Sequence, residues 1–455
     1  MNRRSEPNAA PSAATSIVHG LSFAQALRFW FWLGCISFGG PAGQIAVMHQ
    51  ELVERRRWIS ERRFLHALNY CMVLPGPEAT QLATYVGWLL HGVRGGIAAG
   101  ALFVLPSLLL LIGLSWLYMA YGTLPLVAGA LYGIKPAVTA IVVQAAWRIG
   151  QQTLRNAALL AIAAAAFVAI FAFGLPFPLI VLAAGLFGAL GGRFAPERFR
   201  FGGAPDTVQK SYGPALIDDD TVIAHAAWRP MKFARVLVVG LALWAAVYGT
   251  LWQLLGAENP VVRMGLFFSG AALVTFGGAY AVLPYVYQAA VGHYGWVSAT
   301  QMIDGLALGE TTPGPLIMVV AFVAFVGGWQ TEALGPQMQA AGGALAAIAA
   351  TFFTFLPSFL FILAGGPLVE ATRGNLRLTA PLTAITAAVV GVILNLALFF
   401  AWHVLWPQGF AGPFDALSAA IGMLALIALL RWKISVPKLI AGAAIVGLAA
   451  KLLLP

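Results

Sequence analysis

This chain has little charge, almost no cysteine and none of the common catalytic motifs. Of its 455 residues, 26 are Lys or Arg and 16 are Asp or Glu, so charged residues make up only 9%, against about a quarter in a typical soluble domain. The two cysteines, Cys35 and Cys71, supply neither a disulfide framework nor a metal set. The histidines lack metal-ligand spacing, and neither a nucleotide-binding loop nor a nucleophilic triad is visible. The low charge excludes a soluble protein. Because metal-ligand spacing and catalytic motifs are missing, we expect no metal, no cofactor and no enzymatic activity.

The residues that are present predict an all-α polytopic membrane protein. Hydrophobic residues make up 60% of the chain, and the mean hydropathy is +0.84. Lipid offers the backbone no hydrogen bonds, so such a chain crosses the bilayer as helices. The net charge of +10 comes from basic residues between the apolar stretches, which fits the positive-inside rule better than nucleic-acid binding. The expected surroundings are therefore a lipid bilayer, without nucleic acid.

The chain also contains two copies of one unit. Phe38-Gly39-Gly40 recurs as Phe276-Gly277-Gly278, and at the same spacing Pro75-Gly76-Pro77 recurs as Pro313-Gly314-Pro315. The further shared positions are Trp58 with Trp296, Ser60 with Ser298, and, after a short insertion, Leu105-Pro106-Ser107 with Leu356-Pro357-Ser358. So ordered a recurrence indicates duplication rather than shared composition.

The repeat predicts the domain organisation. Its parts are a disordered cytoplasmic tail (1–20), the first repeat (21–192), an exposed cytoplasmic linker (193–232), a connecting transmembrane helix (233–256) and the second repeat (257–455). The linker is predicted from its charge, glycine and proline. The connecting helix has no counterpart before the first repeat, and one additional crossing would turn the second repeat upside down.

Charge placement favours this inversion. In the first copy the loop between the two glycine motifs contains five arginines, from Arg55 to Arg63, whereas the equivalent stretch from Tyr285 to Asp304 has no Lys or Arg. The positive-inside rule then puts the two loops on opposite sides of the membrane. If every basic segment is cytoplasmic, the layout has nine crossings and four re-entrant hairpins. The alternative, in which every apolar segment crosses, puts the linker or the arginine loop outside.

The Pro-Gly-Pro motifs must interrupt helices in the middle of apolar segments. Proline lacks the N–H and clashes with the preceding turn, and glycine permits a sharp reversal. In a bilayer such a break is tolerated only where it is buried in protein or lines a wet cavity. The new helix that starts there presents unpaired N–H groups and a positive dipole end, which attract anions. The alternative is that the glycines serve close packing and the prolines only kinks, but the duplication of the breaks favours a binding site.

The two copies differ at these breaks in polar residues. Glu78 and Gln81 follow the first Pro-Gly-Pro, while Glu310, Thr311 and Thr312 precede the second. A carboxylate near mid-membrane costs about 2.5–3.5 kcal/mol on insertion scales, so a functional role is expected. An ionised glutamate repels a bound anion, and therefore we expect protonation of Glu78 or Glu310 to accompany binding.

Lys135 is the one basic residue well inside a predicted span and is a candidate to attract the anion, with snorkelling to the interface as the alternative. The predicted substrate-binding residues are Ser37, Gly39, Gly40, Pro75, Gly76, Pro77, Gln81, Lys135, Thr275, Gly277, Gly278, Thr311, Thr312, Pro313, Gly314 and Pro315.

Taken in order, these motifs resemble a known family. Phe38-Gly39-Gly40-Pro41, the arginine loop ending in Trp58-Ile59-Ser60, and Pro75 to Glu78 with Gln81-Leu82-Ala83, all repeated in degenerate form, are similar to the two-domain chromate ion transporters. The resemblance covers nearly the whole chain outside the tail and linker. It implies export of chromate, with sulfate as the related oxyanion, through the bacterial inner membrane, and hence chromate resistance. One departure is Ala279, which stands where the first copy has Pro41.

Other functions remain open at this stage. Uptake or exchange of sulfate or another anion would use the same fold, because sequence does not give direction. A membrane-embedded enzyme is disfavoured by the lack of clustered His, Cys or Asp, and a scaffold by the duplicated broken helices. The coupling ion is undetermined, with the membrane potential and the proton gradient as candidates, and a homodimer is a candidate assembly.

Overall fold

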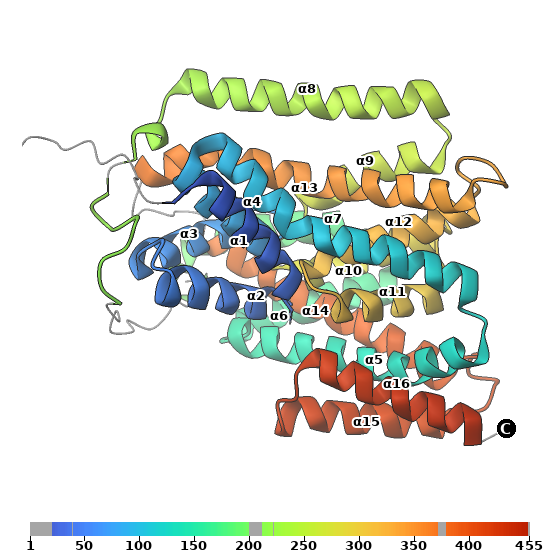
Figure 1. Cartoon of the computed structure of the whole chain (residues 1–455). Coiled ribbons are helices and arrows are strands. Elements are labelled where there is room, and N and C mark those ends of the chain that lie inside the picture. The colour runs from blue at the N-terminus through green and yellow to red at the C-terminus, as the bar shows by residue number, and fades with distance from the viewer. Residues whose placement is uncertain (1–20, 39, 200–211, 222, 372–378, 454–455) are drawn as a thin grey trace, which may run out of the picture.

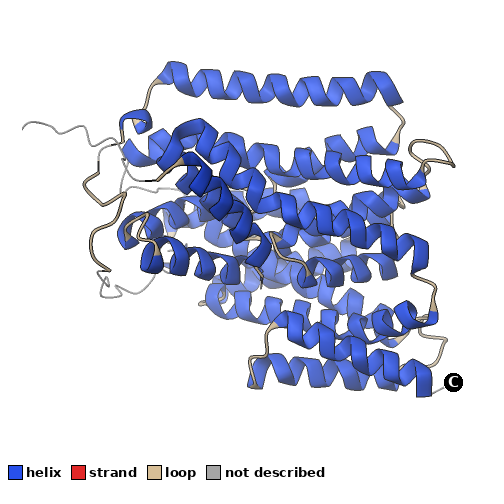
Figure 2. Ribbon diagram, viewed as in Figure 1, coloured by secondary structure: helices blue, strands red, loops and turns tan. Residues whose placement is uncertain are grey.

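The computed structural model describes residues 21–38, 40–199, 212–221, 223–371 and 379–453. The predicted tail (1–20), Gly39 and residues 200–211 of the predicted linker lie outside these residues. The described chain is helical throughout, with a single isolated β-bridge between Ile59 and Ile217 (Figure 2). The all-α polytopic expectation is confirmed.

The first half of the chain forms seven α-helices before the linker. They are α1 (Phe23–Ile36), α2 (Gly40–His49), α3 (Glu61–Val73), α4 (Glu78–Tyr121), α5 (Pro125–Thr153), α6 (Ala157–Phe173) and α7 (Phe177–Phe194). Three short helices accompany them: η1 (Gln50–Arg55) follows α2, and η2 (Pro196–Phe199) and η3 (Ala224–Ala226) lie within the predicted linker.

After the linker, α8 (Pro230–Leu255) connects to the second half. Its helices are α9 (Pro260–Leu273), α10 (Ala279–Tyr287), η4 (Gln288–His293), α11 (Ala299–Thr311), η5 (Leu316–Met318), α12 (Val319–Gln330), α13 (Gln339–Ala371), α14 (Thr379–Leu405), α15 (Ala416–Arg431) and α16 (Val436–Leu453). The halves share one order of elements, apart from the additional α8, from η2, and from α4, whose counterpart is divided into η5, α12 and α13.

Seven of the described helices are long and apolar enough to cross a membrane: α4, α5, α7, α8, α13, α14 and α16. The shorter apolar helices are α6, α9, α12 with η5, and α15. Helix α4 is not continuous, because His91 and Gly92 have non-helical backbone angles, with φ of −135° and +63°. Its first part therefore pairs with α3 as a hairpin. The number of crossings, expected to be nine, stays a prediction.

The paired short helices of the two halves approach the middle from opposite ends of the molecule. In Figure 1, α2 and α3 lie toward the end of the bundle that carries the linker, while α9 lies at the other end. Loop contacts agree with this arrangement. The backbone N–H of Phe177 donates to the Gln288 side chain (3.2 Å), and Asn259 donates to the Ala333 carbonyl (2.8 Å). These loops gather on the side away from the linker.

The described part of the linker is packed rather than fully exposed as predicted. Ile217 is fully buried and pairs with Ile59 of the arginine loop. Arg63 donates to the carbonyl oxygens of Asp218 (2.8 Å) and Thr221 (3.0 Å). The reason is that apolar residues scattered through the linker find a partner surface on the loop. Linker and arginine loop therefore lie on the same side of the molecule.

Candidate functional site

Each of the four glycine motifs ends one short helix and starts another. Gly76 and Gly314 have φ of +120° and +104°, and Gly40, Gly277 and Gly278 have φ of +68°, +81° and +94°. These values strain any residue with a Cβ, so glycine is required for the chain to turn here. Composition and spacing alone predicted the breaks, and the structure has helix ends at all four.

The structure joins the four breaks in crosswise pairs between the two copies. The Gly76 N–H donates to the carbonyl of Thr275 (2.7 Å), and the Gly314 N–H donates to the carbonyl of Ser37 (2.7 Å). Thr275 and Ser37 are equivalent positions, so the two bonds are related by the repeat. Because lipid would leave these groups unsatisfied at a cost of several kcal/mol, each copy completes the break of the other.

Two glutamine side chains hold the Pro-Gly-Pro turns. Gln81 Nε2 donates to the Pro75 carbonyl (2.8 Å), and Gln44, which was not predicted, donates to the Gly314 carbonyl. Both side chains are buried. Gln81 was predicted as a substrate ligand, which stays a prediction, and in the structure its amide nitrogen fixes the turn. Only its Oε1 lacks a partner within the part of the chain that the structure describes.

Two serines of the repeated Leu-Pro-Ser motif face these turns. A Cβ on Gly314 would lie 2.6 Å from the Ser107 Cβ, and a Cβ on Gly76 would fall on the Ser358 hydroxyl. Among the described residues, the Ser107 and Thr80 hydroxyls are buried without a hydrogen-bond partner. The repetition of the motif could have identified Ser107, but no sequence signal marked Thr80.

Helix starts at the breaks differ from those at the outer ends of the hairpins. The first arms α1, α3, α9 and α11 are capped by the side chains of Ser22, Ser60, Asn259 and Ser298. The second arms α4, α10 and η5 follow Pro77, Gly278 and Pro315 without a side-chain cap. Their first N–H groups are therefore left without a capping side chain, and an anion or water could use them.

The glycines differ in how much space surrounds them. A Cβ on Gly40 or Gly278 would meet no other atom within 4 Å, and one on Gly277 would lie 3.7 Å from Thr386. Gly76 and Gly314 are crowded, as described above. The Phe-Gly-Gly breaks thus face open space, whereas the Pro-Gly-Pro breaks are closely packed against neighbouring side chains.

The predicted hydroxyl ligands bond to their own helices. Ser37 and Thr275 donate to the carbonyls four residues earlier (2.7 and 2.6 Å). Thr311 donates to the Leu308 carbonyl (2.9 Å), and Thr312 to that of Gly309 (3.1 Å). In this arrangement the four hydroxyls offer lone pairs rather than protons. An anion would need their hydroxyl protons to rotate away from the helix.

The two candidate proton carriers have different surroundings. Glu310 is 4% exposed and accepts a hydrogen bond from the Tyr280 hydroxyl, which comes from the neighbouring α10. Glu78 is only partly buried and has neither a hydrogen bond nor an ion pair to any other described residue. Glu310 is therefore held by Tyr280, whereas Glu78 has no comparable partner among the described residues at the start of α4.

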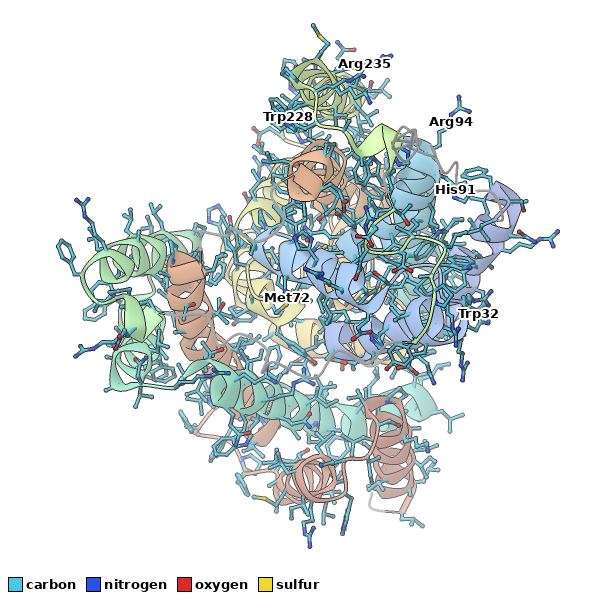
Figure 3. The ribbon with its side chains drawn as sticks, turned by 90° about the vertical axis from the view of Figure 1, so that its left-hand side faces the viewer. Trp32, Met72, His91, Arg94, Trp228 and Arg235 are labelled. Carbon is cyan, nitrogen blue, oxygen red and sulfur yellow. The ribbon has the colours of Figure 1, made fainter. Side chains whose placement is uncertain are left out.

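Equivalent positions around the breaks are more exposed in the first copy. Met72 is 36% exposed, against 4% for its counterpart Glu310. Phe38 is also exposed, whereas its counterpart Phe276 is partly buried. Met72 lies near the middle of the linker-side end of the bundle (Figure 3). The residues around the breaks of the first copy are therefore less completely covered than those of the second.

Lys135 is not an isolated charge. Its Nζ lies 3.7 Å from Oδ2 of Asp304, which is 1% exposed and also accepts from the Tyr118 hydroxyl (3.0 Å). Asp304 belongs to α11 and was not singled out in the sequence. The positive charge of Lys135 is thus paired with a carboxylate of the other copy.

A second buried ion pair connects the copies at the linker side. Arg63 contacts Glu370 at 2.6 Å, with side-chain exposures of 4% and 9%, and the Tyr85 hydroxyl donates to the same carboxylate (2.5 Å). Like Lys135 and Asp304, this pair joins a long helix of one copy to a short hairpin helix of the other. Sequence gave no signal for it, because its partners are far apart in the chain.

The family comparison matches the chain twice. The sequence model of the chromate transporter family matches residues 24–189 and 262–448, which lie within the two predicted repeats; the repeat boundaries stay a prediction. The chain is 35% identical to a chromate transport protein of Pseudomonas aeruginosa, over 85% of this chain and 83% of that protein. It is 27% identical to a chromate transport protein of Cupriavidus metallidurans, over 99% and 98%. A probable chromate transport protein of Synechococcus elongatus is 28% identical over 94% and 95%. No solved structure matches the chain.

Proposed function

Because this chain belongs to the chromate transporter family, we propose that it is a secondary transporter that exports chromate from the bacterial cytoplasm across the inner membrane and so confers resistance. The observation that carries the proposal is the crosswise pairing of the four breaks, Gly76 with Thr275 and Gly314 with Ser37. Broken helices that meet between two repeats are the usual place for a transported ion.

In the proposed site, backbone N–H groups rather than charged side chains hold the anion. The uncapped starts of α4, α10 and η5 supply donors and the positive ends of helix dipoles. The open space at Gly40 and Gly278 gives the oxyanion room. Such donors contact any tetrahedral dianion, so sulfate is the expected competitor of chromate.

Two inverted repeats allow the site to open to either side in turn. We place the N-terminus, the arginine loop and the linker in the cytoplasm by the positive-inside rule. The greater exposure of Met72 than of Glu310 supports the proposal of a site that opens to the cytoplasm, where export begins. A rocking motion that exchanges the two exposures would release the anion outside.

Export of a dianion needs no ATP. Moving two negative charges outward down an inside-negative potential of 100 mV yields about 4.6 kcal/mol, which supports a concentration gradient of more than about a thousandfold. Protonation of Glu310 or Glu78 would relieve repulsion of the anion and couple transport to protons. Tyr280 can keep its hydrogen bond to Glu310 in either protonation state.

Everted vesicles containing the protein test the proposal, because export then appears as chromate uptake. Uptake is measured with sulfate as competitor and with the potential and the proton gradient collapsed separately. We expect uptake that falls when the potential is removed and that sulfate inhibits. The absence of uptake, with protein present in the membrane, would refute chromate export. Sulfate accumulation in right-side-out vesicles would support the alternative of anion uptake or exchange.

Glutamine variants test the coupling. Glu310→Gln and Glu78→Gln are compared with Glu197→Gln, which changes an exposed carboxylate outside the helical core. We expect the pH dependence of uptake to weaken in Glu310→Gln or Glu78→Gln and to persist in the control. If both variants keep the pH dependence of the unchanged protein, neither residue carries the proton.

A further inference from the structure

A large groove separates α8 from the rest of the bundle. Its volume is about 890 Å³, and its walls come from α4, α8 and α13. The walls are apolar, with Ile97 and Leu105 from α4, Val239 and Leu243 from α8, and Phe352 and Phe359 from α13. Figure 1 shows α8 running alongside the bundle at its edge. The groove lies outside the candidate transport site.

Helix α8 contacts the bundle along its second half. Gly240 lies so close to Leu360 of α13 that a Cβ there would overlap the leucine side chain. Farther along, Trp244 Nε1 donates to the Ser269 hydroxyl of α9 (2.8 Å). Toward the linker side, Val238 and Val239 are 66% and 59% exposed. The groove therefore lies mainly between the first half of α8 and helices α4 and α13, and α8 is held against the bundle from Gly240 onward.

The linker-side end of the groove is basic. Arg94 of α4 and Lys232 and Arg235 of α8 line it, and no acidic residue is among its lining residues. All three are exposed, and none forms a salt bridge with another described residue. Figure 3, which faces this end, shows Arg94 and Arg235 extending outward from their helices. Together they present three positive charges at the linker-side end of the apolar groove.

His225 closes the same end without adding charge. Its Nε2 lies 2.7 Å from the Trp88 carbonyl, and its ring meets the Trp88 indole edge to face at 5.5 Å. Burial lowers the pKa of His225, and nearby Lys232 acts in the same direction. The imidazole is therefore neutral at pH 7, and the positive charge of this end belongs to the lysine and the two arginines.

The groove is long enough to cross the hydrocarbon of one leaflet. Along α4 its lining runs from Trp88 to Leu108, and the part from Arg94 to Leu108 is about 21 Å long at a rise of 1.5 Å per residue. Half of a bilayer's hydrocarbon core is about 15 Å thick. An acyl chain lying on the apolar walls would thus place its headgroup phosphate at the level of the three basic residues.

We propose that this groove is a binding site for an anionic phospholipid of the leaflet on the linker side. The apolar walls from α4, α8 and α13 take the acyl chains. Arg94, Lys232 and Arg235 take the phosphate, an arrangement known to favour anionic headgroups between membrane helices. The lipid fills the space between α8 and the two long helices that contact the breaks, and so fixes α8 against the bundle.

Phospholipid retention in the purified protein tests the site. The full chain is purified in mild detergent from membranes that contain phosphatidylglycerol and phosphatidylethanolamine, and the bound lipid is counted by native mass spectrometry. We expect phosphatidylglycerol to be retained in preference to phosphatidylethanolamine. The triple variant Arg94→Gln, Lys232→Gln, Arg235→Gln should weaken its binding about a hundredfold, from roughly a factor of five per charge.

Two further variants separate a site from general attraction to basic surfaces. Arg431→Gln with Lys433→Gln and Lys438→Gln removes three exposed charges near the α15–α16 connection, away from the groove, and should leave retention unchanged. Val239→Trp fills the groove without altering charge and should lower retention. Equal retention of both lipids, or equal loss in the two triple variants, would overturn the proposal. So would dimerisation through α8 that excludes lipid from the groove.

Discussion

Gly314 is the position where the crosswise arrangement makes its sharpest prediction. Its φ of +104° disfavours any side chain, which costs about 1–3 kcal/mol. A Cβ there would also lie 2.6 Å from the Cβ of Ser107, on α4 of the other copy. Overpacking of this kind costs a further 1–3 kcal/mol, approximately. Gly314→Ala should therefore lower the free energy of unfolding by about 2–6 kcal/mol.

Gly278→Ala is the matched control, because it separates backbone strain from crowding. Its φ of +94° is comparable, but a Cβ there would meet no atom within 4 Å. The control should lose only the strain energy, about 1–3 kcal/mol. The unfolding midpoint of each purified variant, followed by tryptophan fluorescence during heating in detergent, should rank Gly314→Ala below Gly278→Ala and both below the unchanged protein.

A double variant tests whether Ser107 causes the crowding that destabilises Gly314→Ala. Ser107→Gly removes the Cβ that Gly314→Ala would strike, at a cost of its own of about 0.5–1 kcal/mol for glycine in a helix. Combined with Gly314→Ala, it should recover about 1–3 kcal/mol of the loss, which appears as a coupling energy in the double-mutant cycle. If Gly314→Ala is no less stable than Gly278→Ala, or if the cycle shows no coupling, the two copies do not meet here as described.

Three other predictions concern ionisable side chains. Arg63→Ala should cost about 3–5 kcal/mol, because it removes a buried ion pair with Glu370, and chemical unfolding in detergent should show the loss. Lys135→Met should cost less, about 1–3 kcal/mol, because the lysine is 27% exposed, and a larger loss than that of Arg63→Ala would contradict this ranking. Burial lowers the pKa of His225 in the folded protein, so the unfolded chain binds its proton first and stability falls as the pH drops below about 6.5. His225→Gln should flatten that part of a thermal melting curve measured against pH, and an unchanged slope would exclude His225 as the cause.

Local sequence determined the class of protein and the positions of its breaks. Low charge and long apolar stretches require membrane helices, since hydropathy acts on each segment by itself. The backbone of Pro-Gly-Pro cannot continue a helix, whatever surrounds it. The helix ends at Pro77 and Pro315 could therefore be predicted, and the duplicated motifs revealed the repeat and the family.

Only the tertiary structure decided which groups meet at the breaks. Gln44 holds Gly314 from 270 positions away along the chain, and Lys135 faces Asp304 instead of open space. Neither pairing leaves a local pattern, because each depends on how two complete repeats cross. The predicted hydroxyl ligands illustrate the same limit, since their residue type was compatible with a binding role but the helix geometry directs their protons to the backbone. Residue type and local sequence determine the chemistry of a side chain, and the packing of distant segments determines its partner.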